Sequence, residues 1–188
     1  VQVPGLKVVV PSTPREAKGL LISAIRDPDP VIFLEPTRSY RLMKEEVEEG
    51  TFAIPLGESR QVREGDDITV VGWGAMMPLI DKAVESASRK GIGCDVLDLR
   101  TLSPMDSNAV LSSVRRTGHC VIVQEAPMTG GLAAELIARI NEGALLSLEA
   151  PVERVTAPDI VVPLPQGERY YYMTAGRIED AIDRVVNF

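Results

Sequence analysis

A chain of 188 residues is long enough for one well-buried core, or for one domain and part of another. Its composition, 45% hydrophobic and 25% charged, argues against disorder, and no apolar run reaches the roughly 20 residues of a membrane-spanning helix. The net charge of −7, with Lys and Arg scattered along the chain, argues against nucleic acid as a partner. No signal peptide opens the sequence, so we expect a cytoplasmic protein with no membrane partner.

The N-terminal segment predicts a strand, a helix and a second strand. The first strand, within Gly5–Ser12, has no earlier structure to cover it, which indicates that the chain is a fragment. The capping box Thr13-Pro14-Arg15-Glu16 begins the helix, because the hydroxyl and the carboxylate can each satisfy a free backbone N–H and the proline suits the first helical position. Asp27-Pro28-Asp29-Pro30 ends the helix before the second strand, Val31–Leu34. These elements form one βαβ unit.

From Glu35 to Asp67, prolines and glycines interrupt a charged stretch that has no helical period. We interpret this stretch as a linker with a short strand near Phe52–Ile54. Its acidic run is interpreted as solvated charge, with a docking patch as the alternative. That run consists of Glu45, Glu46, Glu48 and Glu49.

The second half of the chain alternates strands and helices. The run Cys120–Val123 is continuous and apolar, typical of a strand in a parallel sheet covered on both faces. The other strands are Ile68–Val71, Cys94–Leu99 and Val152–Val155. Asp106 and Thr174 are the expected caps of two of the helices. The pattern predicts a three-layer αβα sandwich around a mainly parallel sheet, with Cys120–Val123 as a central strand and Cys94 and Cys120 as buried free thiols.

The loop after the central strand is the first place to look for a ligand. It leads into a helix whose free N–H groups point back over the strand end, where open α/β sheets bind ligands or partners. Thr129, Gly130 and Gly131 are therefore a candidate anion-binding loop.

The residue pattern contains no catalytic constellation. Gly72-Trp73-Gly74 lacks the third glycine of a dinucleotide fingerprint, and His119, the only histidine, has no nucleophile motif near it. The acid pairs Asp95/Asp98 and Glu45/Glu46 show no reason to be desolvated. From pattern alone, we assign no catalytic, cofactor-binding or metal-binding residue.

A family resemblance adds what the pattern does not. Several long motifs, in order and at similar spacing, closely resemble the beta subunit of the thiamine-diphosphate-dependent 2-oxo acid dehydrogenase decarboxylase component, a family that includes the pyruvate and branched-chain enzymes. They are Pro4–Pro14, Ala17–Leu21, Ile25–Glu35, Asp98–Asp106 and Leu148–Val152. The resemblance implies a tail of a pyrimidine-binding domain at 1–40, a linker at 41–66, and a transketolase C-terminal-like domain at 67–188.

The resemblance also implies where the cofactor lies. In that family the glutamate that activates thiamine diphosphate lies in the N-terminal region, which has no counterpart in this sequence, and the alpha subunit holds the diphosphate and magnesium. The parent complex is then an enzyme, whereas the isolated chain is expected to bind no cofactor and to be inactive. The choice among pyruvate, branched-chain acids and acetoin is not encoded in this part of the family's sequence.

The resemblance further implies the partners. The family's C-terminal domain assembles an alpha-beta heterotetramer with a second beta subunit and, in some members, docks the basic subunit-binding domain of the acyltransferase. By resemblance, Glu149 and the carboxylate of Phe188 are the candidate docking groups, and such charges raise association rate and specificity. The alternative for Glu149 is a solvated strand edge. The competing function is a free-standing regulatory α/β domain that binds an anion or nucleotide at the Gly130-Gly131 helix start.

Overall fold

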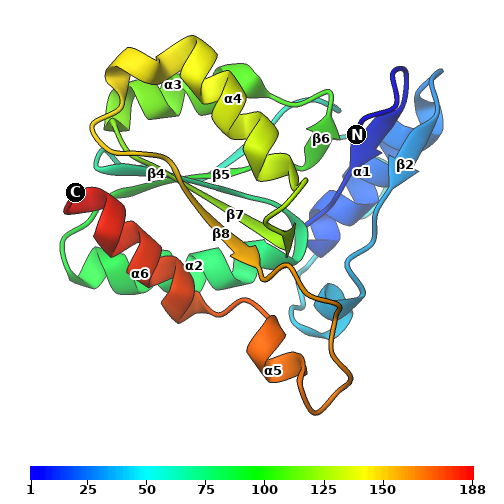
Figure 1. Cartoon of the computed structure of the whole chain (residues 1–188). Helices are drawn as coiled ribbons and strands as arrows, with labels where there is room; N and C mark the ends of the chain where they lie inside the picture. Colours follow the sequence, from blue (N-terminus) through cyan, green and yellow to red (C-terminus); the bar gives the residue numbers. More distant parts are fainter. The chain divides into compact units, whose positions relative to one another are not determined.

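The computed structural model describes residues 1–188, which divide into two compact units (Figure 1). Unit 1 comprises Val1–Arg60, Trp73–Ala75 and Asp98–Asp106. Unit 2 comprises Gln61–Gly72, Met76–Leu97 and Ser107–Phe188. None of the helices is both long enough and apolar enough to cross a membrane.

Unit 2 is built on a five-stranded sheet with the order β3-β5-β4-β7-β8. The strands are β3 (Arg60–Arg63), β4 (Ile68–Gly72), β5 (Cys94–Asp98), β7 (Cys120–Pro127) and β8 (Glu153–Ala157). β7 runs parallel to β4 on one side and to β8 on the other, with Val121 opposite both Val70 and Glu153. The residues from Cys120 to Gln124 are all buried, as an apolar run inside a covered sheet requires. The predicted inner strand is thereby confirmed, although it extends further than expected.

Helices cover both faces of this sheet (Figure 1). α2 (Met77–Arg89) packs with α6 (Ala175–Val186), and α3 (Ser107–Thr117) packs with α4 (Leu132–Ala144) on the opposite face. Each helix buries one stripe of side chains spaced three or four residues apart, such as Ile178, Ala181, Ile182 and Val185 of α6. The three-layer αβα arrangement is therefore confirmed. The second half of the chain also has three short helical segments: η2 (Gly74–Met76), η3 (Leu145–Ser147) and α5 (Glu168–Tyr171).

Unit 1 contains the βαβ unit and one strand from far along the sequence. β1 (Lys7–Val9) pairs in parallel with β2 (Val31–Phe33), and α1 (Pro14–Arg26) connects them. On its other side β1 pairs antiparallel with β6 (Thr101–Ser103). Sequence reasoning did not predict β6, because a three-residue strand between a turn and a proline has no periodicity of its own.

The segment predicted as a linker strand packs against α1 instead of pairing. Ile54 lies in a small core with Val9 and Leu20, and its N–H donates to the carbonyl of Gly19 at 3.1 Å. Residues Phe52–Ile54 are not in a strand, so that prediction was wrong; the strand of this region is β3. η1 (Thr37–Arg41) follows β2. The apolar side chains thus stabilise this segment by burial against the helix.

Candidate functional site

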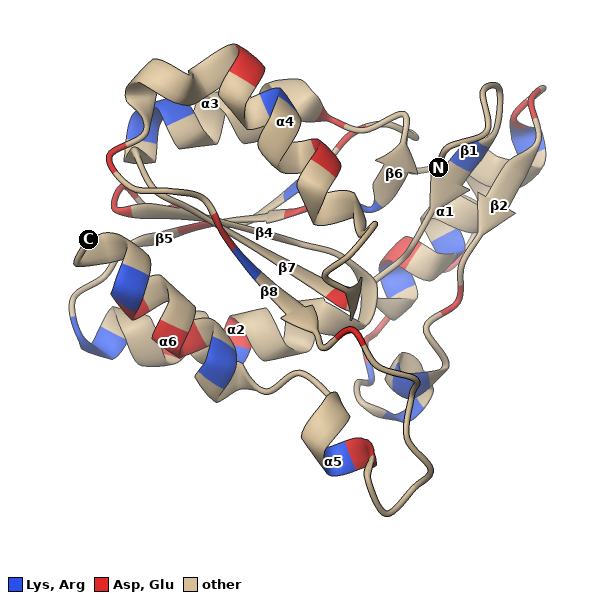
Figure 2. Cartoon of the chain, in the orientation of Figure 1, with Lys and Arg blue, Asp and Glu red and all other residues tan.

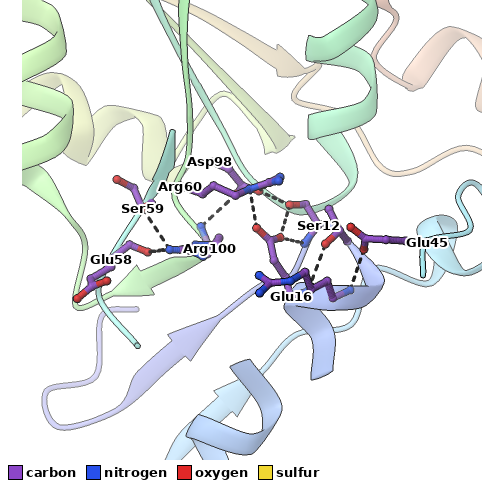
Figure 3. Close-up of polar contacts among 10 residues, drawn as sticks. Ser12, Glu16, Glu45, Glu58, Ser59, Arg60, Asp98 and Arg100 are labelled. Carbon is purple, nitrogen blue, oxygen red and sulfur yellow. Dashed lines mark hydrogen bonds and ion pairs between the residues drawn. The ribbon is translucent and has the colours of Figure 1, made fainter. Parts of the chain in front are cut away.

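A buried acidic cluster lies at the turn between β1 and α1 (Figure 3). The carboxyl groups belong to Glu16 and Asp98, whose exposed fractions are 2% and 0%. Ser12 lies between them: its hydroxyl is 2.7 Å from Glu16 Oε2 and is in hydrogen-bond contact with Asp98 Oδ2. Its backbone N–H also donates to Glu16 Oε2 at 3.0 Å. The two carboxyl groups therefore meet at one hydroxyl.

Local backbone conformation places the cations of the cluster. Arg100 has φ +53°, which turns its N–H back to Asp98 Oδ1 at 3.2 Å. Its guanidinium donates to the carbonyl oxygens of Glu58 (2.9 Å) and Ser59 (3.2 Å) and so holds the residues that precede Arg60. The Nε atom of Arg60 lies 2.7 Å from Glu16 Oε1, although without hydrogen-bond geometry, and a terminal nitrogen of Arg60 lies 3.5 Å from Asp98 Oδ2.

The electrostatics of the cluster favour a proton on Asp98. Burial, followed by the nearby charge of Glu16, raises the pKa of Asp98 to about 6, against the opposing effects of Ser12, Arg60 and the Arg100 N–H. The interpretation that Asp95 and Asp98 have no reason to be desolvated was wrong, since Asp95 is only 1% exposed. Both acids are buried because the strand that carries them is covered on both faces.

Next to Ser12 lies a pocket of about 350 Å³ within unit 1. Its wall is mainly apolar, with a few polar side chains at the beginning of α1 and in η1. The lining includes Thr13, Pro14, Leu21, Phe33, Ser39 and Tyr40. The Thr13 hydroxyl accepts from the Glu16 N–H at 3.2 Å, which confirms the predicted helix cap.

In unit 2, Glu149 and Phe188 line one surface groove of about 460 Å³. The Glu149 N–H donates to the Gly118 carbonyl at 2.9 Å, while its carboxylate has no partner within the chain. The Phe188 ring is 82% exposed. The rest of the lining is polar at Asn141 and otherwise apolar, namely Ile137, Leu145, Leu148, Ala150, Pro151 and Val152. The structure thus brings the two predicted docking residues together.

The candidate anion loop uses its donors within unit 2. Thr129 donates its N–H to Asp159 Oδ1 (2.9 Å) and its hydroxyl to Asp159 Oδ2 (2.7 Å), and these bonds lower the pKa of Asp159. At the helix start, the Ala133 N–H donates to Gln124 Oε1 at 2.8 Å. The Gly131 N–H donates to the Met128 carbonyl at 3.4 Å. An internal carboxylate therefore occupies the Thr129 donors.

The other chemically reactive side chains contact the chain's own backbone or lie buried. Nδ1 of His119 lies 2.9 Å from the Asp67 carbonyl oxygen. Burial raises the pKa of the Cys94 thiol to about 11 and that of the Cys120 thiol to about 12, which keeps both in the unreactive thiol form. No three His, Cys, Asp or Glu side chains converge as metal ligands anywhere in residues 1–188.

These features define an α/β domain of the transketolase type. The chain belongs to the transketolase C-terminal domain family, whose model matches residues 57–178, and the model of the transketolase pyrimidine binding domain matches residues 2–43. Among solved structures, a split-gene transketolase described as an inactive beta4 tetramer aligns with 99% of this chain and 59% of its own at a TM-score of 0.82 and 25% identity. A transketolase from Pichia stipitis aligns with the whole chain and 26% of its own at a TM-score of 0.63 and 14% identity, which shows the fold alone.

The particular relatives are beta subunits of 2-oxo acid dehydrogenases. The chain is 50% identical over 186 residues to the mitochondrial 2-oxoisovalerate dehydrogenase subunit beta 2 of Arabidopsis thaliana, covering 99% of this chain and 52% of the relative. It is 46% identical over 187 residues to the pyruvate dehydrogenase E1 component subunit beta of Bacillus subtilis, covering all of this chain and 58% of the relative. The resemblance stated from the motifs is confirmed. The chain spans about half the length of these relatives.

Proposed function

We propose that the chain is the C-terminal part of the beta subunit of a 2-oxo acid decarboxylase, in a complex that oxidatively decarboxylates pyruvate or a branched-chain 2-oxo acid and transfers the acyl group to lipoyl. The observation that carries this proposal is the 50% identity to a 2-oxoisovalerate dehydrogenase beta subunit over 99% of the chain. A pyruvate dehydrogenase beta subunit from Acholeplasma laidlawii matches equally well, at 50% over 90% of the chain, so identity favours neither substrate. The matched ranges 2–43 and 57–178 support a pyrimidine-domain tail at 1–40, a linker at 41–66 and a C-terminal domain at 67–188.

We propose that the parent enzyme works with thiamine diphosphate and magnesium and that this chain alone holds neither. The match of residues 2–43 to the transketolase pyrimidine binding domain supports the thiamine cofactor. The buried acids Glu16 and Asp98 are already engaged with Arg60 and Ser12. We therefore assign no step of the cofactor's chemistry to these residues.

The proposed inactivity of the isolated chain can be tested with the purified protein. The pure 188-residue chain, given thiamine diphosphate, magnesium and either 2-oxo acid, is expected to release no CO₂. The same chain within a full-length beta subunit, mixed with its alpha subunit, is expected to turn over. Decarboxylation by the isolated chain would refute this part of the proposal.

Subunit assembly is the first role that we propose for unit 2. Residues 160–164, which we call the apolar strap, contain Ile160, Val161, Val162 and Leu164, and the exposed fractions of Val161 and Leu164 are 91% and 83%. No charged residue lies between Asp159 and Glu168; in Figure 2 the loop is tan from the acidic segment just after β8 as far as α5. An apolar surface of this kind marks a protein contact. We propose that the strap packs against the alpha subunit.

The assembly test uses charge substitutions. Val161→Glu and Leu164→Glu in the full-length beta subunit are expected to abolish copurification with the alpha subunit and to leave the far-ultraviolet circular dichroism unchanged. Leu146→Glu is the matched control, because Leu146 is 100% exposed outside the strap. Normal assembly of both strap variants would contradict the proposal.

Docking to the acyltransferase is the second proposed role. The groove at Glu149 and Phe188 offers an unpaired carboxylate beside an exposed ring, which suits the basic subunit-binding domain. Glu149→Gln should weaken binding of that domain roughly two- to fivefold at low salt, and the difference should vanish at high salt because exposed charges are screened. Phe188→Ala should weaken binding at every salt concentration.

The control for charge is Glu142→Gln, which removes the same charge from an exposed position outside the groove lining. Binding is measured by calorimetry across a salt series with the purified subunit-binding domain. Equal affinities of the Glu149→Gln and Glu142→Gln variants would leave Glu149 as a solvated strand-edge residue.

A further inference from the structure

The Ser12 hydroxyl cannot satisfy two ionised carboxylates. A hydroxyl carries one hydrogen, and an ionised carboxylate only accepts. Ser12 Oγ nevertheless lies within hydrogen-bond distance of an oxygen of Glu16 and an oxygen of Asp98. Both contacts are hydrogen bonds only when one carboxyl is protonated and donates to Ser12 Oγ, while the hydroxyl donates to the other.

The surroundings decide which carboxyl carries the proton. Glu16 has the stronger support for its charged form, since Arg60 Nε lies 2.7 Å from one of its oxygens and the Ser12 N–H donates to the other at 3.0 Å. Asp98 has one backbone donor, the Arg100 N–H at 3.2 Å, and its nearest Arg60 nitrogen is at 3.5 Å. The Arg100 guanidinium offers no compensation in hydrogen bonds, because it donates to the Glu58 and Ser59 carbonyls.

We propose that Glu16 and Asp98 share a single proton through Ser12, and that this proton latches the β1–α1 turn to residue 98. In the latched state, Asp98 Oδ2–H donates to Ser12 Oγ, and the Ser12 hydroxyl donates to the Glu16 carboxylate, which faces Arg60. Glu16 and Arg60 then form one ion pair beside the proton, while the Arg100 guanidinium stays bound to the Glu58 and Ser59 carbonyls. The contact bridges 86 positions of the sequence.

Loss of the proton opens the latch. Two buried carboxylates then face each other across one hydroxyl and one partly exposed guanidinium, and Ser12 keeps a hydrogen bond to only one of them. Ser12 also forms part of the wall of the 350 Å³ pocket, so movement of the turn changes the shape of that pocket. The arrangement is a pH-sensitive device built into unit 1.

The direction of the pH effect follows from linkage. Because the pKa of Asp98 is raised in the folded chain from 3.8 to about 6, the folded state binds this proton more tightly than the unfolded state. The contribution of this proton to the free energy of unfolding is complete below pH ~4, the ordinary pKa range of aspartate. The contribution is lost as the pH rises through about 6. The melting temperature of the chain should therefore fall over this window.

The test is a carboxyl ¹³C NMR titration of the whole chain with labelled Asp and Glu. The Asp98 carboxyl is expected to titrate near pH 6. Hydrogen exchange of the Ser12 amide, corrected for its intrinsic pH dependence, should accelerate above that midpoint. An Asp98 midpoint near 4 would overturn the proposal.

Two variants separate a shared proton from simple burial. Asp98→Asn keeps an acceptor for the Arg100 N–H and a donor for Ser12 but cannot ionise, so its Ser12 exchange should stay slow across the window. Glu16→Gln removes the neighbouring charge but leaves the Asp98 carboxyl in place, so the midpoint pH of the Asp98 titration should fall. Two results would refute the latch. One is hydrogen exchange of the Ser12 amide in Asp98→Asn that follows the wild-type pH profile, and the other is an Asp98 midpoint that Glu16→Gln leaves unchanged.

Discussion

Gly131 is the position at which a single methyl group should be most revealing. The Cβ of an alanine would lie 1.9 Å from Gln124 Nε2 and 2.7 Å from the Pro127 carbonyl oxygen. Gln124 is fully buried, donates to Pro127 O at 2.7 Å and accepts from the Ala133 N–H at 2.8 Å. Gly131→Ala must therefore displace a carboxamide that holds the loop to the beginning of α4.

The magnitude follows from the bonds that are lost. A buried polar group left without its partner costs about 1–3 kcal/mol, and the displaced amide leaves both a helix-start N–H and its own donors unsatisfied. The smaller entropy of the unfolded alanine chain returns only about 0.4–1 kcal/mol. A net loss of about 3 kcal/mol corresponds to a fall in melting temperature of roughly 6–12 °C for a chain of this size.

The assay is thermal unfolding of Gly131→Ala alone and in a Gln124→Ala background. Once the carboxamide is absent, the added methyl group clashes only with the Pro127 carbonyl oxygen, so the second cost should be smaller than the first. Gly130→Ala is the control, because its φ is +71° with nothing within 4 Å, and it should show only the ~1–2 kcal/mol of left-handed strain. Equal costs of Gly131→Ala in both backgrounds, or a wild-type melting temperature, would refute this account of the loop.

Two further outcomes test the rest of unit 2. Thr174 accepts the Arg177 N–H as the cap of α6, so Thr174→Ala should cost about 1 kcal/mol in a melting experiment whereas Thr174→Ser should cost much less; a harmless alanine would contradict the cap. Because burial raises the pKa values of Cys94 and Cys120 to about 11 and about 12, neither thiol should react with a disulfide reagent at pH 8 until the chain is denatured, and fast labelling of the native chain would contradict their burial.

Local signals sufficed for most elements of the fold. The run from Cys120 to Val123 has no polar residue to place in water, so it could only be a strand covered on both faces. Thr13 and Thr174 were predicted as caps because their hydroxyls can reach a free N–H within three residues, and both do. Such features depend on neighbours in sequence, and the sequence contains them all.

The candidate site depends on contacts that no local pattern contains. β6 becomes a strand because β1 offers it an unpaired edge, not because Thr101–Ser103 has strand periodicity. In the sequence, Asp98 is like any other charged residue of a strand, and only the fold buries it beside Glu16 and Ser12. Glu149 and Phe188 are far apart in the sequence and come to line one groove only in the folded unit 2. The sequence by itself determined the strands, the helices and their caps, because hydrogen bonds within a few residues and apolar spacing govern them. Only the tertiary structure decided which acids lose water and which charges share a groove, because desolvation depends on every segment that packs around a group.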